Sequence, residues 1–277
     1  MKKIARANPV INVFLVFLAT LTFYPFFFTV ITSFKDNEQF YTRFWGLPNP
    51  IIWGNHLTAF IELSSFMINS LIICVSSIVG ILITTSLSAY SFARLRFPGK
   101  EIVYMTIIAL LMIPGLLMLI PQFILLRDMR LLNTYTGIIV GYIAVHQAFS
   151  IFIMRAFFDT QPIELFEAAR IDGCNEIQAY FRIALPLIKP VLGTVSIMTL
   201  IAMWNDYLWP LIVASDPSKM TIALGLLRYT RTTTLSKVIQ YGPMFAAFVV
   251  ASLPLVILFF ILMRSFIEGL TAGAIKA

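Results

Sequence analysis

Long apolar runs alternate with shorter polar segments along the whole chain. Six of these runs are 18 to 25 residues long, and Asp206 is the only charged residue within them. An α-helix of that length crosses ~30 Å of hydrocarbon, because it rises ~1.5 Å per residue. The runs are residues 10–31, 67–89, 102–126, 137–154, 191–213 and 245–263. The pattern therefore predicts an all-α polytopic membrane protein, with six transmembrane helices in a single transmembrane domain over residues 1–277.

The first apolar run follows the basic residues Lys2, Lys3 and Arg6, as the core of a secretory signal peptide also does. Its 22 residues exceed the length of such a core, which is ~7–15 residues, and no small-x-small cleavage motif follows it. We therefore expect an uncleaved first span.

Residues 162–190 form a polar segment with helical periodicity. Pro162 suits a first helical turn, where its missing N–H would be unpaired in any case. Asp172 and Gly173 predict the end of a first short helix, because glycine adopts a positive φ at little steric cost. Asn175 followed by Gln178 resembles the capping box that begins a second helix. The segment therefore predicts two short helices joined by a turn.

The second of these helices is expected to bury one apolar face. Apolar side chains recur along it at helical spacing, at Ile177, Tyr180, Phe181, Ala184, Leu185 and Ile188. Pro186 and Pro190 are predicted to end the helix and to turn the chain back toward the membrane.

The same polar segment carries a spaced motif. Glu167-Ala168-Ala169 is followed after three residues by Gly173, and after nine more by Ile183-x-Leu185-Pro186. This spacing resembles the cytoplasmic EAA loop of bacterial ABC importer permeases, a two-helix coupling loop that docks to the ATP-hydrolysing subunit. The alternative is an ordinary surface helix between two spans. The resemblance assigns ATPase coupling to Glu167, Ala168, Ala169, Asp172, Gly173, Phe181, Ile183, Leu185 and Pro186.

The resemblance also implies roles for single residues of this motif. Glu167 would make a polar or ionic contact with a groove of the ATPase, and Ala168 and Ala169 would pack closely against it. Gly173 would set the angle between the two helices. The chain itself would be a non-catalytic subunit of an ATP-hydrolysing transport complex.

Further motifs resemble the carbohydrate-uptake branch of these permeases, and in particular the shorter, six-span partner of the maltose-transporter type. They are Phe92-Ala93-Arg94 with Phe97-Pro98-Gly99, residues 204–210 and the tail 266–276. The resemblance implies uptake of a sugar or oligosaccharide across a bacterial or archaeal plasma membrane. The implied partners are a second homologous permease, two ATP-binding subunits that hold the ATP and Mg, and an extracytoplasmic solute-binding protein.

The distribution of basic residues predicts the orientation of the chain. Six spans place both termini on one side of the membrane, and the basic bias favours the cytoplasm. Of the 20 lysines and arginines, 12 fall in the segments assigned to the inside and 8 in the others. Segments 32–66 and 214–244 would then lie outside. Basic residues beside anionic lipid headgroups account for the net charge of +7, so no nucleic-acid partner is needed.

Motifs for catalysis, nucleotides and metals are absent from the sequence. Gly99-Lys100 is not a P-loop, because no glycine stands five residues earlier and Glu101 replaces the Ser or Thr. His56 and His146 stand far apart, without metal-ligand spacing. The sequence has neither a G-x-S-x-G nor an H-E-x-x-H motif. We therefore expect no catalytic residue, cofactor site or metal site in this chain.

Polar residues inside the predicted spans are candidates for the transport pathway. Asp206 is the sole acid there, and ionisable groups within spans are commonly functional. It also lies close to the outer interface beside two tryptophans, so a structural role stays open. For His146 and Gln147 the alternative is hydrogen bonding between helices. The candidate pathway residues are Gln147, Trp204, Asn205, Asp206 and Trp209.

Prolines interrupt the run 102–126. Breaks at Pro114-Gly115 and Pro121-Gln122 would free backbone carbonyl groups, which are tolerated inside a membrane where they line a wet cavity. Kinks without any role in transport are the alternative reading.

Other classes of protein have to be separated from the importer. An ion-coupled secondary transporter usually shows repeated halves and coupling residues in discontinuous spans, whereas this sequence shows one acid and no obvious repeat. A membrane-embedded enzyme would need clustered His, Asp, Glu or Ser at span ends. Dependence of uptake on ATP distinguishes an importer from the secondary transporter. Among importers, the alternative is a permease for a non-sugar solute.

Overall fold

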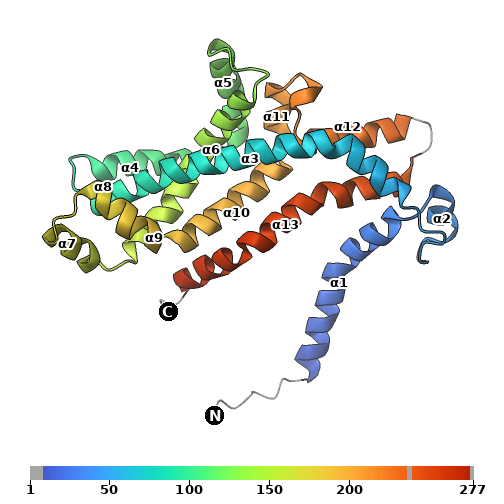
Figure 1. Cartoon of the computed structure of the whole chain (residues 1–277), viewed down its shortest axis with the longest axis horizontal. Coiled ribbons are helices and arrows are strands. Elements are labelled where there is room, and N and C mark those ends of the chain that lie inside the picture. The colour runs from blue at the N-terminus through green and yellow to red at the C-terminus, as the bar shows by residue number, and fades with distance from the viewer. Residues whose placement is uncertain (1–8, 236–238, 275–277) are drawn as a thin grey trace. The chain divides into compact units, whose positions relative to one another are not determined.

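The computed structural model describes residues 9–235 and 239–274, and every regular element within these ranges is helical (Figure 1). Four described helices are long and apolar enough to cross a membrane, and the number rises to six if each of two bent helix pairs is one span. The four are α1 (Pro9–Ser33), α3 (Gly54–Arg94), α6 (Tyr135–Asp159) and Tyr241–Ile261 within α13 (Tyr241–Ala274). The predicted all-α membrane architecture is confirmed. Of the residues that entered the predicted charge bias, Lys2, Lys3, Arg6, Lys237 and Lys276 lie outside the described residues.

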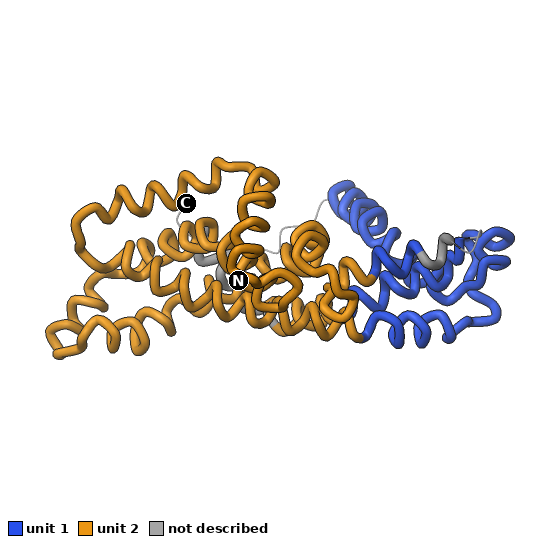
Figure 2. Tube along the Cα trace, turned by 90° about the horizontal axis from the view of Figure 1, so that it is seen from above, with its two compact units in different colours: residues 1–64, 226–253 blue, residues 65–225, 254–277 orange. Residues whose placement is uncertain are grey.

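The chain divides into two compact units (Figure 2). Unit 1 comprises residues 1–64 and 226–253, and unit 2 comprises residues 65–225 and 254–277. Three helices, α3, α12 (Ile222–Leu235) and α13, contribute to both units. The remaining elements are α2 (Asn37–Thr42) in unit 1, and α4 (Lys100–Ala109), η1 (Leu110–Met112), α5 (Gly115–Asp128), α7 (Glu164–Ile171), α8 (Glu176–Ala179), η2 (Tyr180–Ala184), α9 (Leu185–Leu187), α10 (Lys189–Asn205), α11 (Leu208–Val213) and η3 (Pro217–Lys219) in unit 2.

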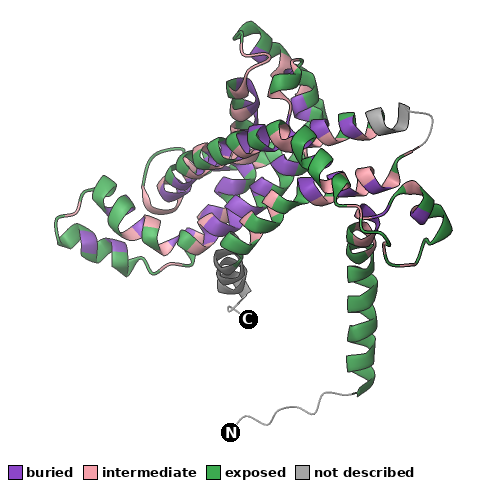
Figure 3. Ribbon diagram, turned by 45° about the vertical axis from the view of Figure 1, so that its right-hand side comes forward, coloured by how far each residue is buried: buried purple, intermediate pink, exposed green. Residues whose placement is uncertain are grey.

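Helix α1 of unit 1 is exposed along almost its whole length (Figure 3). Its most apolar window has a mean hydropathy of 2.1, and none of that window is buried inside the chain. A helix that is apolar on all sides needs an apolar surrounding. α1 therefore suits contact with lipid or with another membrane subunit.

The segment that follows α1 is folded rather than extended. Lys35 is only 1% exposed, and its Nζ donates to the carbonyl oxygens of Arg43 (3.0 Å) and Phe44 (2.8 Å). Asn55, near the start of α3, donates to the carbonyl oxygen of Lys35 (2.9 Å). Burial lowers the pKa of the Lys35 ammonium, because desolvation disfavours its charged form. The region between the first two predicted spans therefore contains α2 and the beginning of α3.

Neither of two predicted spans in unit 2 is one straight helix. The run 102–126 is divided between α4–η1 and α5, which are bent by 107°. Ile113 is extended (φ −86°, ψ 120°), as expected for a residue that precedes a proline. The break therefore lies at Pro114, whereas Pro121 is accommodated inside α5. In the run 191–213, α10 ends at Asn205 and the chain resumes as α11 after an extended Asp206.

Candidate functional site

The polar segment 162–190, called the coupling loop from here on, begins with a capped helix. α7 ends in a turn at Gly173, which has a φ of +81°. The N–H of Gly173 donates to the carbonyl of Arg170 (3.1 Å), and the N–H of Cys174 donates to that of Ala169 (2.9 Å). This pair of bonds is a Schellman motif, which satisfies the last carbonyl groups of a helix. The predicted end of the first helix is confirmed.

The second part of the coupling loop begins with the predicted capping box. Asn175 Oδ1 accepts the backbone N–H of Gln178 (2.8 Å), and Gln178 Oε1 accepts that of Asn175 (3.0 Å). Both bonds are local, so they fix the start of α8 without help from the rest of the fold. The two capped ends make the turn between α7 and α8 stiff.

Three prolines of the coupling loop do not act as the sequence predicted. Pro162 lies before α7, whose N-cap is Ile163. Pro186 does not end the second helix: the π-helical η2 directly precedes α9, which contains Pro186. Pro186 explains the π-helical turn of η2. Its ring and its missing N–H prevent an α-helical hydrogen bond to the carbonyl of Arg182. Pro190 lies in the first turn of α10, which follows after a bend of 70°.

The coupling loop buries one face and exposes another. Phe166 and Ala169 of α7 are buried, so the predicted contact of Ala169 with a partner is wrong, and close approach is left to the exposed Ala168. Ile177 (70% exposed) and Phe181 (59% exposed) were expected on the buried face and lie outside it. Of the other predicted coupling residues, Glu167, Asp172, Gly173 and Pro186 are exposed, and Ile183 and Leu185 are half-buried.

A set of polar contacts, called the clasp from here on, joins the coupling loop to the end of α3. Its members are Tyr90, Arg170 and Glu176. Tyr90 donates its hydroxyl to Glu176 Oε2 (2.8 Å), and Arg170 Nε donates to Glu176 Oε1 (3.0 Å). One turn earlier on α3, Ser86 hydrogen-bonds the hydroxyl of Tyr180 (2.7 Å). The second part of the coupling loop is therefore bound directly to α3, and α7 is joined to it through Arg170.

Arg94, the last residue of α3, adds a second connection. Its Nη2 donates to the carbonyl oxygens of Phe158 (2.5 Å) and Gln161 (2.8 Å), at the end of α6 and just beyond it. Its guanidinium lies 4.5 Å from the centre of the Phe166 ring in α7. The arginine of the Phe92-Ala93-Arg94 motif thus holds α3, α6 and α7 together at one end of unit 2.

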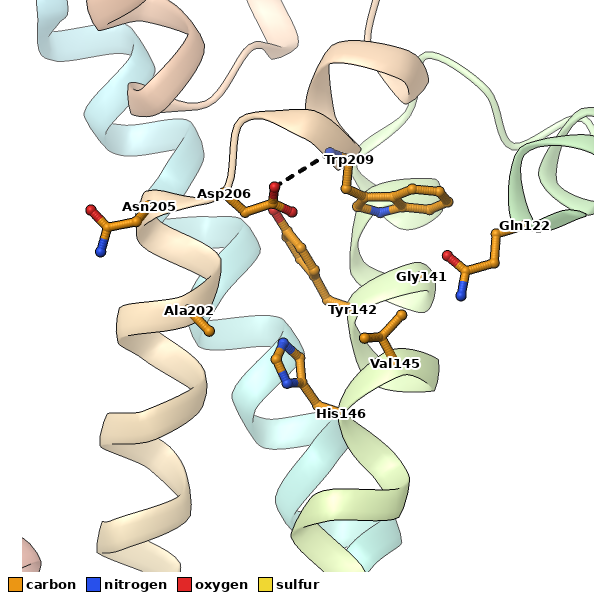
Figure 4. Close-up of a pocket in the computed structure, with 9 residues that line it drawn as sticks. All are labelled: Gln122, Gly141, Tyr142, Val145, His146, Ala202, Asn205, Asp206 and Trp209. Carbon is orange, nitrogen blue, oxygen red and sulfur yellow. Dashed lines mark hydrogen bonds between the residues drawn. The ribbon is translucent and has the colours of Figure 1, made fainter. Parts of the chain in front are cut away.

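A cavity of about 400 Å³ opens among α5, α6, α10 and α11 (Figure 4). It falls within the size range of small-molecule sites, which is ~300–1,000 Å³. Nine residues line it: Gln122, Gly141, Tyr142, Val145, His146, Ala202, Asn205, Asp206 and Trp209. Its lining combines the rings of Tyr142, His146 and Trp209, two amides and a carboxylate with small apolar side chains.

Asp206 is held firmly at the break between α10 and α11. Its Oδ1 accepts the backbone N–H of Leu208 (2.9 Å) and that of Trp209 (3.4 Å). The hydroxyl of Tyr142 points toward the same carboxylate (Figure 4). Asp206 therefore caps the first turn of α11, so the structural role that the sequence left open is present, and its side chain also faces the cavity.

Only part of the predicted pathway set lies at this cavity. Asn205, Asp206 and Trp209 line it, but Trp204 is buried elsewhere. Gln147 instead donates to Thr84 Oγ1 of α3 (2.7 Å), which is the alternative considered for it. Gln122 and His146, which were weighed from the sequence but not included in the pathway set, also line the cavity, and Tyr142 was missed. The spacing of four between Tyr142 and His146, which places both on one face of α6, is a signal that was available.

The Trp209 ring is fixed by its neighbours. Its Nε1 donates to the carbonyl oxygen of Ile138 (3.2 Å), and a Cβ on Gly141 would overlap the indole. We expect Gly141→Leu to displace the ring and to lower the unfolding free energy by about 2 kcal/mol, as overpacking does. Thermal unfolding and tryptophan emission of the purified chain measure this. Gly115→Leu is the matched control, because no atom lies within 4 Å of its Cβ position. Equal destabilisation by both changes would contradict the prediction.

Metal ligation is not supported by the geometry. Within the ranges that the structure describes, no three His, Cys, Asp or Glu side chains are grouped so that they could hold a metal ion.

Known proteins resemble this chain over most of its length. The family described as "Binding-protein-dependent transport system inner membrane component" matches residues 76–271. The chain is 28% identical to the diacetylchitobiose uptake system permease protein NgcG of Streptomyces coelicolor, over 98% of this chain and 90% of that protein. It is 31% identical to the arabinooligosaccharides transport system permease protein AraQ of Halalkalibacterium halodurans, over 94% and 93%. It is 30% identical to the sn-glycerol-3-phosphate transport system permease protein UgpE of Yersinia pestis, over 94% of each.

One solved structure has the same fold. It is the crystal structure of a bacterial ABC transporter involved in the import of the acidic polysaccharide alginate. The TM-score is 0.80, the sequence identity is 23%, and the alignment covers 93% of this chain and 95% of that chain.

Proposed function

This chain belongs to the family of binding-protein-dependent transport system inner membrane components, and we infer that it is the permease subunit that carries a sugar or oligosaccharide through an ABC importer. It is a multi-pass membrane protein and a transport subunit. We propose that a second homologous permease completes the pathway, that two ATP-binding subunits hold the ATP and Mg, and that an extracytoplasmic solute-binding protein delivers the cargo.

One observation supports the coupling assignment most directly, namely the stiffness of the coupling loop. Its two helical parts are fixed by a Schellman motif and a capping box, while Glu167, Ala168, Ile171 and Phe181 remain exposed. An ATPase that docks here would meet a preformed surface with apolar and acidic groups. A preformed surface loses little conformational entropy on binding.

The clasp supplies a route from the docked ATPase to the spans. Movement of α7 and α8 would act on Glu176, which holds Tyr90 of α3, and on Phe166, which lies under Arg94. The part of α3 that belongs to unit 2 is one continuous helix that ends at Arg94, so a force at its end is carried along that helix. In this proposal the coupling loop and both termini face the cytoplasm.

The cargo proposal draws on relatives and on the cavity. NgcG and AraQ carry names of oligosaccharide uptake systems, and UgpE carries that of an sn-glycerol-3-phosphate transport system. The lining of the cavity offers amide and carboxylate groups for hydroxyls and an indole for a sugar face, a combination that suits a carbohydrate.

An affinity purification from native membranes tests the proposal. We expect the tagged chain to recover a second permease and an ATP-binding subunit, and Glu167→Lys to lose the ATP-binding subunit while it keeps the permease. Glu38→Lys, an exposed charge reversal in α2, is the control and should keep both. Recovery of the well-folded chain alone would overturn the importer assignment and favour an ion-coupled transporter.

A further inference from the structure

The lining of the cavity among α5, α6, α10 and α11 carries negative charge only. Of its nine lining residues, all of them described, Asp206 alone carries a formal charge at neutral pH with histidine neutral, and no lysine or arginine is among them. Val145, Ala202 and Gly141 add apolar wall to the same cavity. Apolar walls screen a charge less than water does, so the field of a single carboxylate extends across the cavity.

The carboxylate cannot easily turn away from the cavity. The two backbone N–H groups of the first turn of α11 hold one of its oxygens, and the break in the chain places Asp206 between α10 and α11. Rotation of the side chain would leave both N–H groups without this acceptor. The negative charge is therefore a fixed property of the site.

The remaining polar groups of the cavity suit hydroxyl-bearing ligands. The amides of Gln122 and Asn205 can donate and accept, and the indole of Trp209 is fixed in place by the Ile138 carbonyl. None of these three groups offers a cation to a ligand. An acidic ligand would meet an uncompensated like charge, whereas an ammonium group would gain an ion pair.

We propose that Asp206 makes this cavity selective for uncharged or amino-bearing sugars and against sugar acids and sugar phosphates. The inference rests on the proposed function, because it takes the cavity as part of the sugar pathway. Asp206 is then a specificity-determining residue, and its capping of α11 is what fixes its direction.

A cysteine placed in the cavity reports on this charge in the assembled importer. Ala202 is exposed on the cavity wall, one helical turn before Asp206. The variant Ala202→Cys is made in a background of Cys74→Ala and Cys174→Ser, which removes the native thiols. The thiolate attacks a methanethiosulfonate reagent, forms a mixed disulfide and releases methanesulfinate. The reagents carry either a trimethylammonium or a sulfonate group, and each rate is normalised to that of a free thiol.

We expect the cationic reagent to react about tenfold faster than the anionic one, since a carboxylate roughly one turn away attracts the first and repels the second. Asp206→Asn should bring the ratio close to one, while its amide oxygen still caps α11. The reactions are run at pH 8, where an ordinary imidazole, with a pKa of ~6.5, is neutral.

Sugars provide the second measurement. Diacetylchitobiose or its de-acetylated amine, at millimolar concentration, should slow the modification more than digalacturonic acid does. Equal normalised rates for the two reagents, or protection by digalacturonic acid alone, would overturn the charge inference. The same preparation separates the two proposals: if the chain purifies with its ATP-binding subunit and the ratio is one, only the charge inference fails. If it purifies without that subunit, the importer assignment fails.

Discussion

Gly173→Val should reduce sugar uptake at least about tenfold while the chain still folds. Gly173 has a φ of +81°, and no atom lies within 4 Å of its Cβ position, so the effect is conformational rather than steric. A residue with a Cβ loses roughly 1–2 kcal/mol in the left-handed region, and a β-branched residue is disfavoured further. Because 1.4 kcal/mol is about a factor of ten in an equilibrium, the native turn between α7 and α8 would lose about that factor in population relative to other turn conformations.

The matched variant is Gly173→Asn, because asparagine tolerates a positive φ. We expect it to retain uptake within about twofold of the parent importer. Uptake and ATP hydrolysis are measured together on the reconstituted complex, and thermal unfolding is followed separately. Gly173 lies in an exposed turn, so the unfolding temperature should change little in either variant. Loss of uptake in the asparagine variant as well, or full uptake with valine, would remove Gly173 from the coupling role.

Short-range sequence patterns were enough to predict the helix ends and the turn of the coupling loop. The Schellman turn at Gly173 and the capping box of Asn175 and Gln178 each depend on residues at most five positions apart. Such contacts do not need the rest of the fold, so short-range rules find them. The same holds for the break at Pro114, because a proline restricts the residue before it whatever the surroundings.

Long-range packing explains what the sequence did not reveal. Helical spacing placed Ile177 and Phe181 together with Tyr180, yet only Tyr180 is buried, because Ser86 and Tyr90 of α3 lie at that side. Ala169, which was expected to contact a partner, is also buried. Periodicity identifies an apolar face, but the helix that covers it is set by the tertiary structure.

The residues that line the cavity were likewise only partly predictable, because tertiary packing decides which side chains face it. Trp204 and Trp209 are both typical of a pathway by sequence, but the end of α10 at Asn205 turns only Trp209 toward the lining. Gln147 donates a hydrogen bond to Thr84 of α3, a residue distant in sequence. Tyr142 and His146 could be grouped by their spacing, but that Gln122 lies near them depends on the bend at Pro114.

Glu176→Lys should uncouple ATP hydrolysis from sugar uptake. The change removes the acceptor of the Tyr90 hydroxyl and places a cation beside Arg170. Tyr90 is 4% exposed, so a hydroxyl that loses its partner there costs about 1–3 kcal/mol. Arg170 and Glu176 have side chains about half exposed, and such a pair contributes only ~0–1 kcal/mol after screening. The larger part of the effect is therefore expected from the bond to Tyr90.

This difference in size can be measured with single and paired variants. Tyr90→Phe and Glu176→Ala should each reduce the number of sugars transported per ATP, and together they should cost less than the sum, because both remove the same bond. The charge exchange Arg170→Glu with Glu176→Arg restores an ion pair and should recover only a minor part of the loss. Recovery to the parental ratio by that exchange would mean that the exposed ion pair is the dominant contact. Additive losses in the Tyr90 and Glu176 pair would mean that the clasp does not carry the motion into α3. A loss of folded protein alone would leave the number of sugars transported per ATP unchanged. A fall in this number therefore distinguishes a coupling role of the clasp from a purely stabilising one.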